Sequence, residues 1–365
     1  MIPFRSSRRK PGPSADSPRE PRSRIWAPAF AGASGVMVAV AVLVGAAQHS
    51  SAKPQPPRPR PADGSIRVAV TPVPLDPRSP AETRLGALVY AGGVELSSPD
   101  TSRLHGLSGI DVAEDGRSFV SVSDDGDLVT GRLTLDAKGR LTGVAGVKLQ
   151  PLRDEQGRPL QGKQQGDAEA VTLLPGGAIA VSFEREHRIL SYARPGGAAR
   201  RLWAPTASDR GFRLDENAGV EALAVDHGAM VVGSEGGDVR TLAGGRLGRE
   251  RLAPEPPGGF NLTGLDALAG GDWIAVYRAW DPFRDSRIVV AHLPAPRCIR
   301  APCVAPHGRI DLARLQRPLT VDNVEAIAAV PLAGGGWRLY LLSDDNFRRG
   351  QRTLLLAFDW KSQAR

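Results

Sequence analysis

After residue 60, apolar residues alternate with polar ones and show no sustained 3.6-residue period. The first alternating segments are 66–70 and 85–96, and short segments of the same kind, separated by turns rich in Gly, continue toward the C-terminus. Alternation with a period of two is typical of strands with one buried face, whereas helices place apolar residues every three or four positions. The pattern predicts an all-β domain.

One short pattern occurs five times in this domain, and each copy sets a carboxylate among small and apolar residues. The copies return at intervals of roughly 45 to 60 residues, which suits a propeller blade of about four strands. The copies are 108–112, 166–171, 218–223, 262–268 and 322–327, with the carboxylates Asp111, Glu169, Glu221, Asp266 and Glu325.

Each copy is followed by a turn and then by an alternating strand that ends in polar residues. The fourth of these strands ends in Arg278, and the others end in the acids Asp124, Asp125, Glu184, Glu235, Asp344 and Asp345. Five copies, together with the strands before Asp100, predict a β-propeller of about six blades. A β-sandwich is the alternative fold, but it gives no reason for similar acidic segments to return five times.

Blades of a propeller are related by rotation about one axis, so equivalent residues lie on a shared ring. We therefore expect both sets of carboxylates to meet at one end of the central channel. Because clustered carboxylates repel one another, they need a cation, and Ca²⁺ prefers such oxygen ligands. Arginines of the same loops are alternative partners. Acids that merely end turns are the simplest interpretation of one copy, but five copies in register favour a shared polar site.

The N-terminal region has the layout of an export signal. Much of the net charge of +8 lies in basic residues before and after the uncharged span 25–48, so the charge does not indicate nucleic-acid binding. We predict a signal peptide or signal anchor over 1–52, a Pro-rich linker over 53–64 and one domain over 65–365. The protein is then periplasmic or otherwise extracytoplasmic, and an uncleaved segment would anchor it to the inner membrane.

The chain has two cysteines, Cys298 and Cys303, which lie close together in a Pro-flanked stretch. An oxidising compartment favours a disulfide between them. Zinc is disfavoured because no second pair of ligands accompanies them.

The repeated segments also carry a family resemblance. The residues concerned are 107–111, 166–170, 217–223, 323–327, and 342–347 with 351–355. In these segments the sequence resembles esterase-like phytase-domain proteins, a bacterial envelope family related to the β-propeller phytases, over roughly 104–360. The resemblance implies a propeller, an extracytoplasmic setting and a metal-dependent hydrolase, presumed to be Ca²⁺-dependent, that acts on a small phosphorylated or ester substrate.

By that resemblance, specific residues receive roles. Glu221 and Glu325 are the predicted catalytic residues. Candidate phosphate contacts are Lys163, Arg185, Arg278 and Arg348. Candidate metal ligands are Glu169, Glu184, Glu221, Glu235, Glu325, Asp344 and Asp345. The absence of a dense lysine cluster argues against phytate itself as the substrate.

Two alternatives to this function stay open. The first is a monomeric, non-catalytic propeller of the cell envelope that binds a ligand and is stabilised by calcium. Its ligand surface would be lined by aromatic residues, namely Trp273, Tyr277, Trp280, Phe283 and Trp337. We favour the other interpretation of these residues, which is that they form blade core. The second is a hydrolase that uses His105 or His187 as acid or base. A serine hydrolase is disfavoured because no Gly-x-Ser-x-Gly segment surrounds a serine.

Overall fold

The computed structural model describes residues 63–361 except 210, 217, 295–307 and 349. This part of the chain contains 22 β-strands and one short helix, α1 (Gly162–Gly166), so the all-β prediction is confirmed. None of its helices is long and apolar enough to span a membrane. The predicted leader, most of the linker and the predicted Cys298–Cys303 bridge lie outside the described residues.

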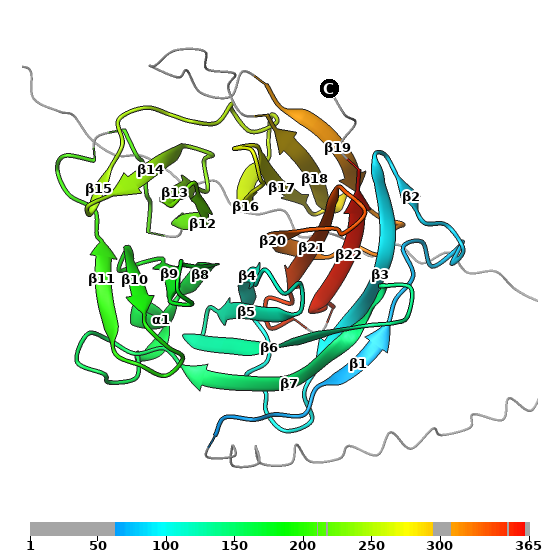
Figure 1. Ribbon diagram of the computed structural model, residues 1–365, viewed down its shortest axis with the longest axis horizontal. Coiled ribbons are helices and arrows are strands. Elements are labelled where there is room, and N and C mark those ends of the chain that lie inside the picture. The colour runs from blue at the N-terminus through cyan, green and yellow to red at the C-terminus, as the bar shows by residue number, and fades with distance from the viewer. Residues whose placement is uncertain (1–62, 210, 217, 295–307, 349, 362–365) are drawn as a thin grey trace, which may run out of the picture. The chain divides into compact units, whose positions relative to one another are not determined.

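The strands form five antiparallel sheets around a central axis, which is the architecture of a β-propeller (Figure 1). Blade 1 contains β4 (Leu107–Val112), β5 (Ser118–Ser123), β6 (Asp127–Leu135) and β7 (Leu141–Pro151). Blade 2 contains β8 (Ala168–Leu173), β9 (Ile179–Phe183), β10 (Arg188–Tyr192) and β11 (Ala199–Trp203). Blade 3 contains β12 (Val220–Asp226), β13 (Ala229–Ser234), β14 (Val239–Ala243) and β15 (Arg246–Leu247).

The last two blades follow the same plan. Blade 4 contains β16 (Asn261–Ala267), β17 (Trp273–Asp281), β18 (Asp285–Leu293) and β19 (Ile310–Leu315). Blade 5 contains β20 (Asn323–Pro331), β21 (Trp337–Asp344), β22 (Leu354–Trp360), β3 (Leu88–Ser97) and β1 (Ala69–Pro72), and β2 (Arg84–Leu85) also pairs with β3. The five copies of the sequence pattern are the innermost strands β4, β8, β12, β16 and β20 (Figure 1).

The prediction of about six blades is wrong, because the strands before Asp100 complete blade 5 instead of forming a blade of their own. β3 pairs antiparallel with β22, so that Leu88 lies opposite Trp360 and Glu95 opposite Leu354. This pairing joins the N-terminal strands of the domain to its last blade. The propeller is closed by backbone hydrogen bonds between residues far apart in the sequence.

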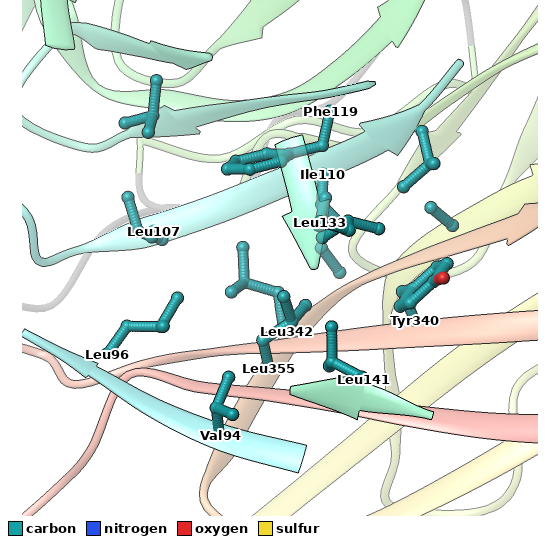
Figure 2. Packing of buried hydrophobic residues seen from close by; sticks show 14 of the residues in the cluster. Val94, Leu96, Leu107, Ile110, Phe119, Leu133, Leu141, Tyr340, Leu342 and Leu355 are labelled. Atoms are coloured by element: carbon teal, nitrogen blue, oxygen red, sulfur yellow. The ribbon is translucent and has the colours of Figure 1, made fainter. Parts of the chain in front are cut away.

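Five apolar clusters fill the spaces between neighbouring blades. The cluster between blades 5 and 1 combines Leu96 of β3 and Leu355 of β22 with Ile110 of β4 and Phe119 of β5 (Figure 2). Each strand thus places one row of alternating side chains against each neighbouring blade. The buried strands are therefore covered on both faces, as in β9, where five consecutive residues are buried, and not on one face as the alternation indicates.

The inner strands approach one another closely at two glycines. A Cβ at Gly109 of β4 would lie 2.8 Å from the Val171 amide nitrogen of β8, and one at Gly264 of β16 would lie 3.0 Å from the Ile327 amide nitrogen of β20. No real Cβ tolerates the first distance without a shift of backbone. The two glycines therefore allow five inner strands to close around a narrow channel.

Candidate active site

A β-bulge marks each inner strand near its N-terminal end. The register with the second strand of the blade skips one residue in β4, β12, β16 and β20 and two in β8. Bulges redirect a side chain and are frequent beside active sites. The first skipped residues in the five blades are Ser108, Glu169, Glu221, Thr263 and Glu325.

The second strand of each blade ends beside these bulges, because it runs antiparallel to the inner strand. At this end of the second strands stand Asp124, Glu184, Glu235, Arg278 and Asp344, one from each blade. The first three lie one residue beyond the last position paired with the inner strand, and Arg278 and Asp344 pair with Asn261 and Asn323. Together with Glu169, Glu221 and Glu325 they line one cavity of about 310 Å³. Rotational symmetry thus brings three of the five repeat carboxylates and the ends of the five second strands to one end of the channel.

Most of the sequence-predicted site residues lie in this cavity. Of the predicted metal ligands, only Asp345 is absent from the lining; its side chain accepts a hydrogen bond from the Gly106 amide, 3.3 Å away. Among the predicted phosphate contacts, Arg348 is exposed on the loop after β21 and does not line the cavity. The other three, Lys163, Arg185 and Arg278, do.

Asp111 and Asp266 lie elsewhere, so their predicted convergence with the glutamates is wrong. Each stands three positions beyond the bulge of its strand and bonds backbone of the next inner strand: Asp111 Oδ2 accepts from the Leu173 amide at 2.7 Å, and Asp266 Oδ2 from the Ala329 amide at 2.7 Å. Burial raises the pKa of Asp111 to about 6, and burial and then Asp111 raise that of Asp266 well above its usual value. These two acids form a separate pair further along the channel.

Four ion pairs neutralise part of the cavity, and one of them joins Lys163 to Asp167 at 3.5 Å. Arg278 Nη1 lies 3.0 Å from Glu325, which explains the basic residue at the position where other blades carry an acid. Lys163, from α1, lies 2.7 Å from Asp124. Arg185 Nε donates to Asp167 at 2.6 Å.

Asp167 was not among the sequence-predicted site residues. It is 2% exposed, and its carboxylate lies with those of Glu169 and Glu184 in a group whose ligand atoms are all within 4.8 Å of one another. Its position, two residues before the bulge, is acidic in no other blade: the equivalent residues are Gly106, Gly219, Asn261 and Asn323. The local segment Asp167-Ala168-Glu169 was the signal that could have identified it.

The cavity as a whole carries an excess of acid. Its lining contains eight carboxylates and three cationic side chains. Among the described residues, the lining carboxylates without an ion pair to a cationic side chain are Glu169, Glu184, Glu221, Glu235 and Asp344. Glu221 accepts only from the Gly219 amide at 3.2 Å, and Glu235 from the Asn261 side chain at 2.6 Å.

Crowding of carboxylates raises their pKa values. Burial, followed by repulsion from Glu221, raises the pKa of Glu169 well above its usual range, and burial followed by repulsion from Glu325 does the same for Glu221. Burial is also the main cause that raises Glu184 and Asp344 to a pKa of about 7. Without a cation, the cavity therefore binds protons near neutral pH.

Neither candidate histidine lines the cavity. His105 packs edge-on against Phe347 with ring centroids 3.9 Å apart, and burial lowers its pKa. His187 Nε2 lies 2.9 Å from the Asp215 carbonyl oxygen. The acid–base chemistry of the cavity thus rests on carboxylates.

The sequence matches the family described as "Phytase-like: Esterase-like activity of phytase" over residues 102–347. The chain belongs to this phytase-like family, and the resemblance predicted from the repeated segments is confirmed. No curated protein shows a significant match to the chain.

Among solved structures, similar chains include a putative gluconolactonase, with 15% identity, a TM-score of 0.40, and coverage of 84% of this chain and 96% of its own. Another is a calcium-binding protein, regucalcin, from Agrobacterium tumefaciens, with 13% identity, a TM-score of 0.41, and coverage of 77% and 92%.

Proposed function

We propose that this protein is a calcium-dependent hydrolase of phosphoesters or esters. One observation carries the proposal: five carboxylates without a cationic partner among the described residues share a cavity with three basic side chains. Unpaired carboxylates are costly to remove from water, so their collection in one cavity favours a bound cation. The basic residues supply contacts for an anionic group at the same place.

The residues present fit a hard divalent cation. Asp167, Glu169 and Glu184 place carboxylate oxygens within 4.8 Å of one another, and Glu221 and Glu235 line the same cavity. Ca²⁺ takes six to eight such oxygens, some of which are water. When bound, the ion would supply a water of lowered pKa and would neutralise charge that develops on the substrate.

The protein's own side chains bind the substrate, transfer a proton and position one another. Arg278, Arg185 and Lys163 donate hydrogen bonds to the substrate's phosphoryl or carbonyl oxygens and orient it; two-pronged guanidinium contacts suit phosphate especially. Glu221, at the bulge of β12, lies in the same cavity and is the carboxyl that transfers a proton to the leaving alcohol. Glu325, held by Arg278 and by the Asn323 side chain at 2.6 Å, positions the arginine.

The experiment follows calcium binding and turnover in one preparation. Chelator-stripped protein is titrated with CaCl₂ by calorimetry while hydrolysis of 4-nitrophenyl phosphate and 4-nitrophenyl acetate is recorded. We expect turnover to appear as Ca²⁺ binds, and Glu221→Gln to lower kcat by about 100-fold or more, the contribution typical of a proton-transferring group. Glu114→Gln, at an exposed turn outside the cavity, is the matched control and should leave turnover unchanged.

The outcomes separate the two candidate functions. If Ca²⁺ binds and raises only the melting temperature, with no turnover of any ester, the protein is a calcium-stabilised binding module, which the four internal ion pairs of the cavity also allow. If no Ca²⁺ binds, the metal proposal fails. An extracytoplasmic location and a monomeric state remain parts of the proposal that the leader and the fold family suggest.

A further inference from the structure

The β17–β18 hairpin of blade 4 is longer than its counterparts at the cavity end of the propeller. Tyr277 pairs with Leu262 just as Ser123 pairs with Leu107 in blade 1. Beyond that level β5 ends at once, whereas β17 and β18 continue through three residue pairs past Arg278, ending at Asp281 opposite Asp285. The hairpin therefore rises beyond the rim on which the other second strands end.

This extension carries two uncovered aromatic side chains. Trp280 is 55% exposed and Phe283 is 96% exposed, while Trp273 and Tyr277 of the same strand are buried, as expected for blade core. Exposed apolar surface of this size beside a polar cavity is typical of a ligand-binding position. Of the large apolar side chains that are exposed in the described part of the chain, the others are Val89, Ile310 and Phe347.

Strand geometry places Trp280 beside the cavity. Side chains two positions apart on a strand point to the same face and lie about 7 Å apart along it. Arg278 points toward β20, where it pairs with Glu325, and lines the cavity. Trp280 therefore projects from the same face, one step further out at the mouth.

A hollow of about 580 Å³ lies against this face of the hairpin. It is lined by Trp280, Phe283 and Arg284 of the hairpin and by Gln316 and Arg317 after β19. Asp281 accepts hydrogen bonds from the amides of Phe283 and Arg284 at 3.0 and 2.9 Å. The hollow thus has a hydrogen-bonded frame.

Ion pairs fix both ends of that frame. Asp285 lies 2.7 Å from Arg317, and Asp281 lies 3.1 Å from Arg287. A hollow held in shape by such contacts binds a ligand without ordering the loop first, which favours affinity.

We propose that this hollow binds an aromatic group of the substrate, so that the enzyme acts on monoesters of aryl alcohols. The proposal rests on the hydrolase function above and names its substrate class. The charges support it, since a cavity of eight carboxylates and three cations repels a substrate with many phosphates but admits one anionic group. The ester group then lies near Arg278, and the aromatic ring lies against Trp280 and Phe283.

The test uses two non-hydrolysable ligands, phenylphosphonate and methylphosphonate, titrated into the calcium-loaded full chain. We expect phenylphosphonate to bind about tenfold more tightly, as stacking on an aromatic side chain typically contributes. Trp280→Ala and Phe283→Ser should remove this preference and leave the affinity for methylphosphonate unchanged. Ile310→Ala, which removes an exposed apolar side chain from β19, is the control and should change neither affinity.

Three results would overturn the aryl site: equal affinities for the two ligands, no binding of either, or an unchanged preference in Trp280→Ala. Loss of binding to anionic phospholipid vesicles in these variants, with phosphonate affinities unchanged, would instead make the hairpin a membrane contact. The hydrolase proposal can fail independently of the aryl site. If phenylphosphonate binds more tightly but no ester is hydrolysed, the protein has an aryl-binding site and is not a hydrolase. If esters are hydrolysed but the two phosphonates bind equally, the protein is a hydrolase of a different substrate class.

Discussion

Arg185 combines a position in the cavity with an unfavourable backbone conformation. Its φ is +59°, in the left-handed region where side chains other than Gly cost about 1 kcal/mol or more, and its guanidinium holds Asp167. Strain at a residue that contacts a site is often maintained for function. Replacing Arg185 by Gly and by Ala separates the two properties.

We expect Arg185→Gly to be more stable than Arg185→Ala by about 1 kcal/mol, because only Gly relieves the strain. Both variants should lose turnover of phosphate esters to the same extent, since both lack the guanidinium. Urea unfolding measures the first effect and kcat/KM the second. Equal stability of the two variants would mean that the strain is not retained without the arginine.

The acids Asp111 and Asp266 make a second prediction about single residues. Both have folded-state pKa values above the usual 3.8, so the folded chain binds more protons than the unfolded chain at mildly acidic pH. Their contribution is then most favourable at low pH and is lost as pH rises through about 6, the folded-state pKa of Asp111. Stability in chelator should therefore fall as pH rises from about 4 to about 6 while Asp111 titrates, and should fall further while Asp266 titrates.

Asp111→Asn should make this decline shallower, because it removes one titrating group and also the repulsion on Asp266. Urea unfolding at a series of pH values gives the slope of the unfolding free energy against pH. This slope is informative even though the variant loses a backbone hydrogen bond and is less stable than the unchanged protein at every pH. A slope identical to that of the unchanged protein would show that the pair does not titrate as described.

These residues also mark the limit of prediction from the sequence. Glu169, Glu221 and Glu325 were found because small residues flank each of them in the same way. Asp111 and Asp266 have similar neighbours but lie three positions beyond the bulge, and a bulge is defined by pairing with another strand. Sequence spacing alone does not show which face of an irregular strand a side chain occupies.

At the scale of elements, the inner strands depend on glycine where they touch. A Cβ at Gly264 would lie 3.0 Å from the Ile327 amide nitrogen and 3.1 Å from the Ala326 Cα. Both are backbone atoms, which cannot relieve the contact by a change of rotamer as a side chain can. We expect Gly264→Ala to destabilise the protein by about 2 kcal/mol, the typical cost of overpacking. Thermal and urea unfolding measure it.

Gly334→Ala is the matched control, since no atom lies within 4 Å of its added Cβ and its φ is outside the left-handed region. It should change stability by less than about 0.5 kcal/mol. If Gly264→Ala were equally neutral, β16 and β20 would have to separate freely, and the narrow channel would not constrain the ring.

Alternation located most strands correctly but not the lengths of hairpins. The segments 85–96 and 66–70 correspond to β3 and, in part, to β1. The sequence does not predict the extension of β17, and it favours blade core for Trp280, as for Trp273, because aromatic residues at strand positions usually belong to the core. Only the pairing with β18 shows that β17 extends further than the second strands of the other blades.

For the whole molecule, the number of blades depends on one contact that local patterns do not encode. The early strands have the same alternation whether they form a sixth blade or complete the fifth. Their pairing with β22 is decided by closure, because an unpaired β22 would leave backbone donors and acceptors exposed at an edge. Counting the repeats therefore gives the correct number of inner strands. The number of blades follows only when it is known how the N-terminal strands of the domain pair with its last blade.

Closure through β3 predicts that the ring does not form without it. A chain that starts at residue 98 lacks β1, β2 and β3, including Leu88 and Val94, which are fully buried. It should aggregate and show no cooperative melting, whereas a chain that starts at residue 63 should melt as one unit. Size-exclusion chromatography and circular dichroism compare the two.

A peptide covering residues 63–97, added to the shorter chain during refolding, tests whether the strand acts through pairing. Because β3 contributes backbone hydrogen bonds to β22 and apolar side chains to two clusters, the peptide should restore cooperative melting. If the shorter chain alone melted like the longer one, each blade would be stable with its immediate neighbours. The cavity, which takes residues from all five blades, would then not depend on a closed ring.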